Sequence, residues 1–150
     1  MFIEVIELPS YKGTLNVTAH ELYTALLEQS IAEIKQITGK ELTIEELEKG
    51  YKYTAKKQVG KEIKDATVHF KKTEPDRRIH VAYSLERYFY EMNYILTPLS
   101  ENTVEFSYSQ TMNNEKMNFI QKMMFENKMK RWMKALETVI LNKRRTGNVG

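Results

Sequence analysis

The chain of 150 residues contains no cysteine, so disulfides, thiolate nucleophiles and cysteine-ligated zinc or iron–sulfur sites are excluded within it. It also contains no run of about 18 apolar residues, and the sequence therefore predicts no transmembrane helix. Glycine and proline are scarce, with six and three residues, and no Gly-rich phosphate loop, GxSxG or HExxH motif occurs. What remains is 41% hydrophobic and 29% charged residues, a composition typical of one globular domain.

Charge is distributed unevenly along the chain. Residues 115–150 hold nine Lys and Arg against three acidic residues, and the other 114 residues hold fourteen against seventeen. This basic end fits either an anionic partner or a solvated helix face. Trp132 is predicted to point inward, so the stacking aromatics typical of nucleic-acid binding are missing and nucleic acid is not an expected partner. The first seven residues include Glu4 and Glu7, which is untypical of a secretion signal, and we expect a cytoplasmic protein.

The first half of the chain predicts a short strand followed by two helices. Residues 2–8 alternate as a strand that ends at Pro9, and Gly13 is expected in the turn that follows. Thr18 and Glu21 form a capping-box pattern that opens a helix closed by Gly39. A second capping box, with Thr43 as its first residue, opens a short helix that ends at Gly50.

From Tyr51 the hydrophobic period falls to two, which predicts an antiparallel meander of about six strands in all. Hairpins are expected around Pro75 and Ser100. The inward residues are predicted to pair as Phe70–Ile79, Val68–Val81 and Ala66–Tyr83 in the first hairpin, and as Leu96–Val104, Tyr94–Phe106 and Met92–Tyr108 in the second. A long helix is expected over residues 114–142. We therefore expect a single domain over residues 1–143 and a flexible basic tail over residues 144–150.

This order of elements resembles the helix-grip fold of the START-related superfamily, which includes birch-pollen-allergen-like proteins, polyketide cyclases and Hsp90-ATPase-activator homologues. Residues 15–22 (LNVTAHEL) resemble the start of its first helix. Residues 34–43 (IKQITGKELT), on to Gly50 and Tyr51, are similar to a small bacterial family of unknown function often encoded near sugar-phosphotransferase genes. The resemblance covers residues 14–112. It implies an α+β fold, a curved antiparallel sheet wrapped on a long C-terminal helix with two short-linked helices after the first strand.

Tyrosines are the most informative candidates for a site. Seven of the nine are predicted to point inward by alternation, and a buried phenol needs a partner for its hydroxyl. A cavity that holds a partly polar ligand would supply that partner, and the resemblance implies such a cavity between sheet and helix. Alternatively the rings pack as core and their hydroxyls reach the rim. The residues predicted to line the cavity are Tyr53, Val68, Phe70, Val81, Tyr83, Tyr90, Met92, Tyr94, Phe106, Tyr108, Met129, Trp132 and Met133.

The last helix carries two apolar faces in this interpretation. Met129, Trp132 and Met133 lie on the main stripe, where they could cover a cavity or simply fill the core. Phe119, Ile120 and Met123 lie off that stripe, and an exposed apolar patch of this kind predicts self-association, as in a homodimer.

Metal binding and cofactors are not expected. His69 and His80 are predicted to stand opposite each other on the outer face of the sheet, but a zinc site needs further ligands. Lys71 and Arg78 are the neighbouring outward residues, and their charges would repel a cation.

Three functions remain, and the first is the one we expect. It is non-catalytic binding of a small hydrophobic or amphipathic ligand in the cavity, oriented by tyrosine hydroxyls. The rival is a protein–protein or co-chaperone-like module, which predicts a filled interior and apolar residues on the surface. The third is a cyclase-type enzyme, which requires an inward carboxylate, histidine or arginine; no catalytic residue is assigned.

Overall fold

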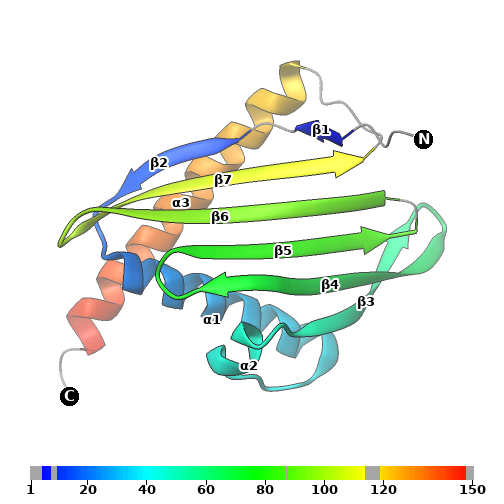
Figure 1. Cartoon of the computed structure of the whole chain (residues 1–150), viewed down its shortest axis with the longest axis horizontal. Helices are drawn as coiled ribbons and strands as arrows, with labels where there is room; N and C mark the ends of the chain where they lie inside the picture. The colour runs from blue at the N-terminus through cyan, green and yellow to red at the C-terminus, as the bar shows by residue number, and fades with distance from the viewer. Residues whose placement is uncertain (1–4, 8–9, 87, 114–118, 148–150) are drawn as a thin grey trace.

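The computed structural model describes residues 5–7, 10–86, 88–113 and 119–147, and Figure 1 shows their arrangement. Seven strands form one antiparallel sheet of order β1-β7-β6-β5-β4-β3, and β2 also pairs with β7. The predicted α+β architecture, with a curved sheet and a long C-terminal helix, is confirmed. The elements are β1 (Val5–Glu7), β2 (Tyr11–Leu15), α1 (Ala19–Thr38), α2 (Ile44–Glu48), β3 (Lys52–Val59), β4 (Glu62–Glu74), β5 (Arg78–Leu85), β6 (Tyr88–Ser100), β7 (Thr103–Asn113) and α3 (Phe119–Gly147).

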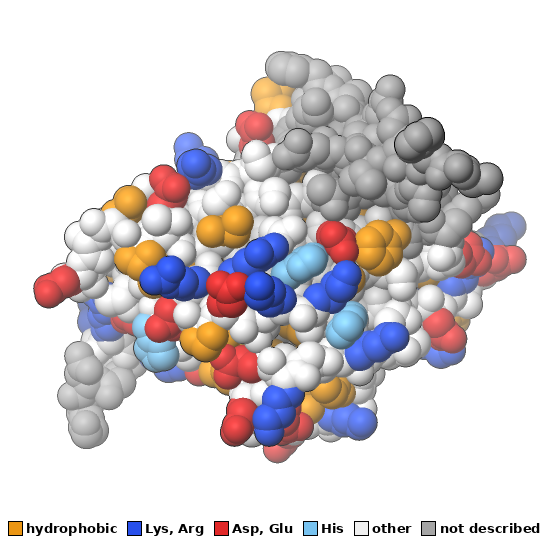
Figure 2. Space-filling view, in the orientation of Figure 1, with side chains coloured by type: hydrophobic (Ala, Val, Ile, Leu, Met, Phe, Trp, Pro, Cys, Tyr) orange, Lys and Arg blue, Asp and Glu red, His pale blue; other side chains and the backbone are white. Residues whose placement is uncertain are grey.

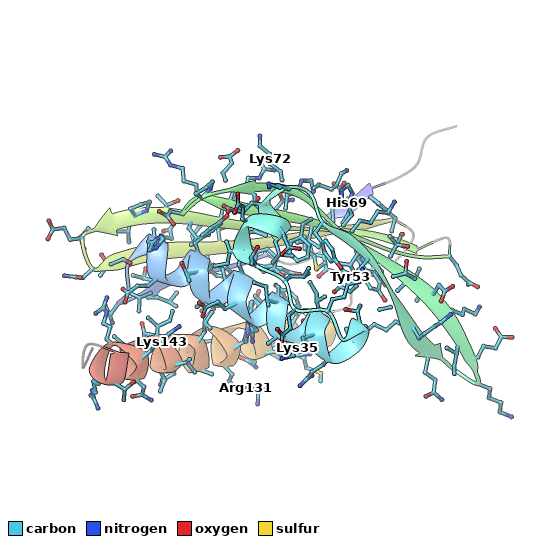
Figure 3. All side chains as sticks on the ribbon, turned by 90° about the horizontal axis from the view of Figure 1, so that it is seen from below. Lys35, Tyr53, His69, Lys72, Arg131 and Lys143 are labelled. Atoms are coloured by element: carbon cyan, nitrogen blue, oxygen red, sulfur yellow. The ribbon has the colours of Figure 1, made fainter. Side chains whose placement is uncertain are left out.

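Helices α1 and α3 lie on one side of the sheet, and no helix of the described residues covers the other side (Figures 1 and 3). Both predicted capping boxes are present, at Thr18 for α1 and at Thr43 for α2. Gly39 ends α1 in the left-handed region, with φ 78°, where a residue without a side chain is favoured. None of the described helices is both long and apolar enough to cross a membrane.

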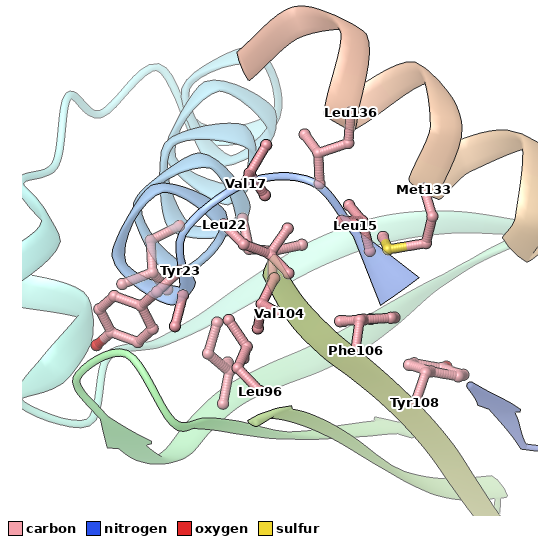
Figure 4. Close-up of a cluster of buried hydrophobic side chains, with 14 of the residues drawn as sticks. Leu15, Val17, Leu22, Tyr23, Leu96, Val104, Phe106, Tyr108, Met133 and Leu136 are labelled. Atoms are coloured by element: carbon pink, nitrogen blue, oxygen red, sulfur yellow. The ribbon is translucent and has the colours of Figure 1, made fainter. Parts of the chain in front are cut away.

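The core lies where α1 and α3 meet the β2, β6 and β7 end of the sheet (Figure 4). Phe106 on β7 and Leu22 on α1 are fully buried there, and Met133 of α3 is 2% exposed. Figure 4 shows these side chains converging from three elements that are distant in sequence. Burial of this apolar cluster is the main force that holds the helices on the sheet.

Both predicted hairpin registers are wrong by two residues at the inward pairs, and the inward faces are nonetheless right. Around Pro75, Phe70 pairs with Val81 and a register shift follows at Lys71. Around Ser100 the turn is tighter than expected, so Tyr94 pairs with Tyr108. A slip of two residues keeps every side chain on its face, so alternation alone cannot detect it.

One strand was not predicted. Gly13, expected in a turn, lies in β2 opposite Phe106. A side chain at this position would meet the ring of Tyr11, because a Cβ on Gly13 would lie 2.5 Å from the Tyr11 hydroxyl oxygen. The glycine therefore allows close approach within a strand, a role that sequence reasoning mistook for a turn.

The C-terminal helix extends further than the sequence suggests. Residues 144–150 were expected to form a flexible tail, but α3 continues to Gly147. The guanidinium of Arg144 donates bidentate hydrogen bonds to the carboxylate of Glu21 at the start of α1, with Nε 2.6 Å from Oε2. This contact gives the last turn of α3 a tertiary partner, and basic residues also stabilise a helix C-terminus. Residues 148–150 lie outside the described part.

Candidate functional site

A cavity of about 240 Å³ lies between the inner face of the sheet, α1 and one side chain of α3. Figure 3 shows Tyr53 in this layer, between the strands and the helices, with His69 and Lys72 on the opposite side of the sheet. The residues that line it are Leu26, Gln29, Ser30, Glu33 and Ile37 of α1, Tyr53, Ala55 and Lys57 of β3, Val68 and Phe70 of β4, Ile79, Val81 and Tyr83 of β5, Met92 and Tyr94 of β6, and Trp132 of α3.

Strand pleating explains which residues line the cavity. On each contributing strand the lining residues are spaced by two, so that successive members point to the same face. The lining residues of α1 follow a different rule, since Leu26, Ser30, Glu33 and Ile37 are spaced by four, three and four and form one helical row.

The cavity has an apolar floor and a polar mouth. Phe70, Ile79 and Val81 are buried, with exposed fractions of 6% or less. Glu33 and Lys57 are exposed, and they mark the mouth between α1 and β3. A molecule in this cavity would therefore place its apolar part on the sheet and its polar end toward the gap between α1 and β3.

Tyrosine hydroxyls are the principal polar groups inside. Within the described residues, the hydroxyls of Tyr53, Tyr83 and Tyr94 form no hydrogen bond with the protein. Desolvation raises the pKa of all three phenols above the ordinary value. They are neutral at pH 7 and have both a proton and lone pairs to offer a ligand.

Glu33 places a negative charge at this site. After burial, which is the larger cause, its carboxylate is the second reason that the pKa of Tyr53 and Tyr94 rises to about 12. The charge of Glu33 is thus felt at both hydroxyls. Sequence reasoning did not identify this carboxylate as a cavity residue.

Trp132 is the contribution of α3. Its indole Nε1 donates a hydrogen bond to Oε1 of Gln29, 3.2 Å away, which ties α3 to α1 beside the cavity. The ring meets those of Tyr94 and Phe106 edge-on, with centroids 6.4 and 6.3 Å apart. The only tryptophan of the chain therefore lies where a bound molecule would change its fluorescence.

Of the thirteen predicted lining residues, eight lie at the cavity wall: Tyr53, Val68, Phe70, Val81, Tyr83, Met92, Tyr94 and Trp132. The other five do not line it. Tyr90 pairs with Tyr83, and the two rings lie 5.5 Å apart. Phe106, Tyr108, Met129 and Met133 are buried in the core, where the Tyr108 hydroxyl donates to Gln110 Oε1 at 2.8 Å. Tyr108, Met129 and Met133 therefore fit the alternative in which tyrosines and methionines pack as core.

The residues that prediction missed come chiefly from α1. The sequence stripe of this helix was treated as core alone, although the row from Leu26 to Ile37 includes Ser30 and Glu33. Polar residues set into an otherwise apolar helical row were the available signal of a cavity-facing side. Ala55 and Ile79 were also missed, although both belong to predicted inward faces, and no face was predicted for Lys57.

The outer-face histidines are not opposite each other. His69 pairs with Ala82, and His80 pairs with Lys72, because the hairpin turns around Asp76, later in the sequence than the predicted register requires. His80 instead lies near Glu91, with Nε2 and Oε2 3.6 Å apart, and burial lowers its pKa. In the described part of the chain no three His, Asp or Glu residues are placed to hold a metal ion.

Comparison with solved structures defines the class of fold. Ara h 8.0201 matches with a TM-score of 0.61 at 10% identity, covering 93% of this chain and 99% of that one. The Zhui aromatase/cyclase from Streptomyces sp. R1128 matches with a TM-score of 0.60 at 10% identity, over 96% and 98% of the two chains. The Aha1 dimer from Colwellia psychrerythraea gives 0.54 at 12% identity, over 90% and 96%. The chain has the START-like helix-grip fold that the sequence predicted.

The family follows from the sequence itself. The chain belongs to the family described as "Domain of unknown function (DUF3284)", whose model matches residues 10–133. That match spans the elements from β2 to the middle of α3 and includes every residue that lines the cavity. No curated protein matches this sequence.

Proposed function

We propose that the protein binds a small hydrophobic or amphipathic molecule in the cavity between the sheet, α1 and Trp132. The observation that carries this proposal is the cavity itself, with its buried apolar floor and three tyrosine hydroxyls that lack partners within the described residues. A filled interior was the expectation for a purely protein-binding module. An interior that keeps a space lined by phenols supports the ligand instead.

The volume limits the size of the ligand. An apolar cavity of about 150 Å³ is sufficient for benzene in other proteins. The 240 Å³ here suit one aromatic ring, or an aliphatic group of similar size, with a short polar substituent. Burial of the apolar part supplies most of the affinity, and the hydroxyls of Tyr53, Tyr83 and Tyr94 orient the polar part.

Catalysis in the same cavity is a second candidate, and Glu33 is the observation that favours it. An inward carboxylate was the requirement for an enzyme, and Glu33 lines the cavity near two phenols. A similar fold occurs in the Zhui aromatase/cyclase. Recovery of a bound molecule unchanged after long incubation supports simple binding, and its chemical conversion supports catalysis.

The first experiment is native mass spectrometry of protein purified from its own host, followed by binding of 2-phenylethanol as a neutral one-ring probe. We expect a retained small molecule, and a rise in melting temperature together with a change in Trp132 fluorescence when the probe is added.

Ala55→Leu, which fills the cavity, should abolish both responses to the probe. Thr54→Leu, on the same strand but exposed on the other face, should keep them. Absence of a retained molecule and of any probe response in the unmodified protein would contradict the proposal.

Self-association is a separate proposal, predicted from Phe119, Ile120 and Met123. The structure does not describe the side chains of Phe119 and Ile120. Met123 and its neighbour Met124 are 48% and 66% exposed on α3. Exposed methionines on one helix support a contact with another copy, and one protein of similar fold is an Aha1 dimer. Light scattering should give the mass of a dimer for the unmodified chain and of a monomer for Met123→Lys; a monomer in both would refute it.

A further inference from the structure

The proposed ligand cavity has an unusual share of aromatic rings. Tyr53, Tyr83 and Tyr94 approach it from three strands, and Trp132 approaches it from α3. Each ring presents a face with negative electrostatic potential, to which a positively charged group is attracted. Several rings around one small space are the arrangement by which proteins bind alkylated ammonium groups.

The negative charge of Glu33 at the mouth also favours a positively charged ligand. Glu33 forms no ion pair or hydrogen bond with another described residue, although it lies beside the cavity. Its carboxylate raises the pKa of the Tyr53 and Tyr94 phenols, second only to burial, so its field reaches the interior. The amide oxygen of Gln29 lies on the same wall and is already engaged by Trp132.

Lys57 is the one cation among the lining residues, and it has to be weighed against Glu33. It is exposed on β3, where it pairs in register with Lys64. Lys64 forms salt bridges with Glu62 and Glu86, with Nζ–O distances of 3.2 and 2.6 Å. The electrostatic causes of the raised pKa of Tyr53 and Tyr94 include Glu33 and do not include Lys57. Glu33 is therefore the lining charge that acts on these two rings.

We infer that the ligand is a cationic amphiphile, a primary or alkylated amine on a one-ring or short aliphatic body. Its ammonium group lies between the Glu33 carboxylate and the rings of Tyr53, Tyr94 and Trp132, and its apolar part lies on Phe70 and Val81. This inference deepens the proposed function and depends on it. Cation–π attraction and the carboxylate act together, so the charge of the ligand sets selectivity while its apolar body sets basal affinity.

A matched series of three soluble probes tests the sign of the charge. Phenethylamine is a cation at pH 7, 2-phenylethanol is neutral and phenylacetate is an anion, and all three have similar size. We expect Trp132 fluorescence titrations to give about tenfold tighter binding for the amine than for the alcohol, with phenylacetate weakest. Added salt should weaken binding of the amine and leave binding of the alcohol unchanged. Salt screens the attraction between the ammonium group and the Glu33 carboxylate, and the neutral alcohol makes no such charge pair.

Variants assign the preference to its source. Glu33→Gln keeps the shape of the side chain and should remove most of the tenfold preference, with little effect on the alcohol. Glu28→Gln is the matched control, since Glu28 lies on the same helix, pairs with Lys143 at 3.1 Å and does not line the cavity. It should leave the preference intact. Tyr94→Leu should also weaken the amine more than the alcohol.

The outcomes separate the two proposals. Binding of the alcohol without any preference for the amine overturns the cationic ligand and leaves ligand binding standing. Preferred binding of phenylacetate, lost in Lys57→Met, likewise overturns it and assigns the mouth to Lys57. Failure of all three probes to bind the unmodified protein contradicts the proposed function itself.

Discussion

Glu21 shows how one residue can serve two elements. Its side chain accepts a hydrogen bond from the backbone N–H of Thr18, 2.9 Å away, and so completes the capping box of α1. The same carboxylate accepts two hydrogen bonds from the guanidinium of Arg144, in the last turns of α3. The start of one helix is thereby fastened to the end of the other, across 123 residues of sequence.

Glu21 should make stability depend on pH. Hydrogen bonds from Arg144, and secondarily from Thr18, lower its pKa from 4.5 to about 2. A carboxyl group with a lowered folded-state pKa contributes stability above its unfolded pKa and loses it as pH falls from about 5 toward 2. Because Glu21 is partly solvated, we expect Glu21→Gln to cost about 1–2 kcal/mol at pH 7.

Urea unfolding of Glu21→Gln and the unmodified chain between pH 7 and 2.5 measures this contribution. Glutamine can still accept the Thr18 N–H, so the difference isolates the charge on the Arg144 contact. The difference should shrink steadily below pH 5. Glu45→Gln, whose carboxylate is 79% exposed and lies 3.8 Å from Lys49, should show no difference at any pH. A cost for Glu21→Gln that stays constant down to pH 2.5 would show that the charge is not responsible.

At the scale of elements, helices were easier to predict than strand pairings. Capping boxes at Thr18 and Thr43 mark helix starts by local chemistry that needs no partner elsewhere in the chain. The faces of the strands followed from alternation for the same reason. Register depends on the turn and on the bulge at Lys71, and neither changes the alternation in a way that can be read beforehand.

The candidate site was easier to predict on the sheet than on α1. Tyr53, Tyr83 and Tyr94 follow from strand periodicity, and Trp132 from the stripe of the last helix. Glu33 was harder to assign, because its place in the row of α1 is a weak signal: an exposed glutamate on a helix is ordinarily solvated. Only the packing of α1 against the sheet brings its carboxylate to the cavity.

The two sides of α3 should respond differently to the same kind of truncation. Met133, at the middle of the helix, is 2% exposed and faces the sheet, whereas Val139, in its second half, is 59% exposed. Met133→Ala removes buried apolar atoms and leaves a cavity, so we expect a loss of about 2–4 kcal/mol. Val139→Ala should change stability by less than about 0.5 kcal/mol. Chemical denaturation of both variants makes the comparison, and equal losses would contradict the described packing of α3.

At the scale of the whole molecule, the fold encloses phenols between two layers. Tyr53 and Tyr94 line the cavity, Tyr23 is buried beside α2, where it donates to Glu48 at 2.7 Å, and Tyr108 is buried in the core. Desolvation is the largest cause of a raised pKa in each of these four side chains. The layered architecture, rather than any local motif, therefore sets how the protein responds to alkali.

Stability should fall as pH rises above 10. A phenol whose folded-state pKa is raised contributes stability that is fully present below its unfolded pKa of 10 and is lost as pH rises toward its folded value, about 12 for Tyr53 and Tyr94. Absorbance at 295 nm should thus show some phenols ionising near pH 10 and others only near pH 12 or on unfolding. In concentrated urea all nine should ionise together near pH 10.

Circular dichroism at each pH distinguishes ionisation within the folded protein from ionisation on unfolding. Tyr94→Phe removes one delayed phenol, and its cost at pH 7 should be small because the hydroxyl has no hydrogen-bond partner in the described part of the protein. Glu33→Gln should bring the delayed ionisation to a lower pH, since it removes the charge that opposes a second negative charge at Tyr53 and Tyr94, whereas Glu28→Gln should not. If every phenol ionised near pH 10 while the protein stayed folded, the tyrosines would have to be solvated, and an enclosed phenolic cavity would be incompatible with that result.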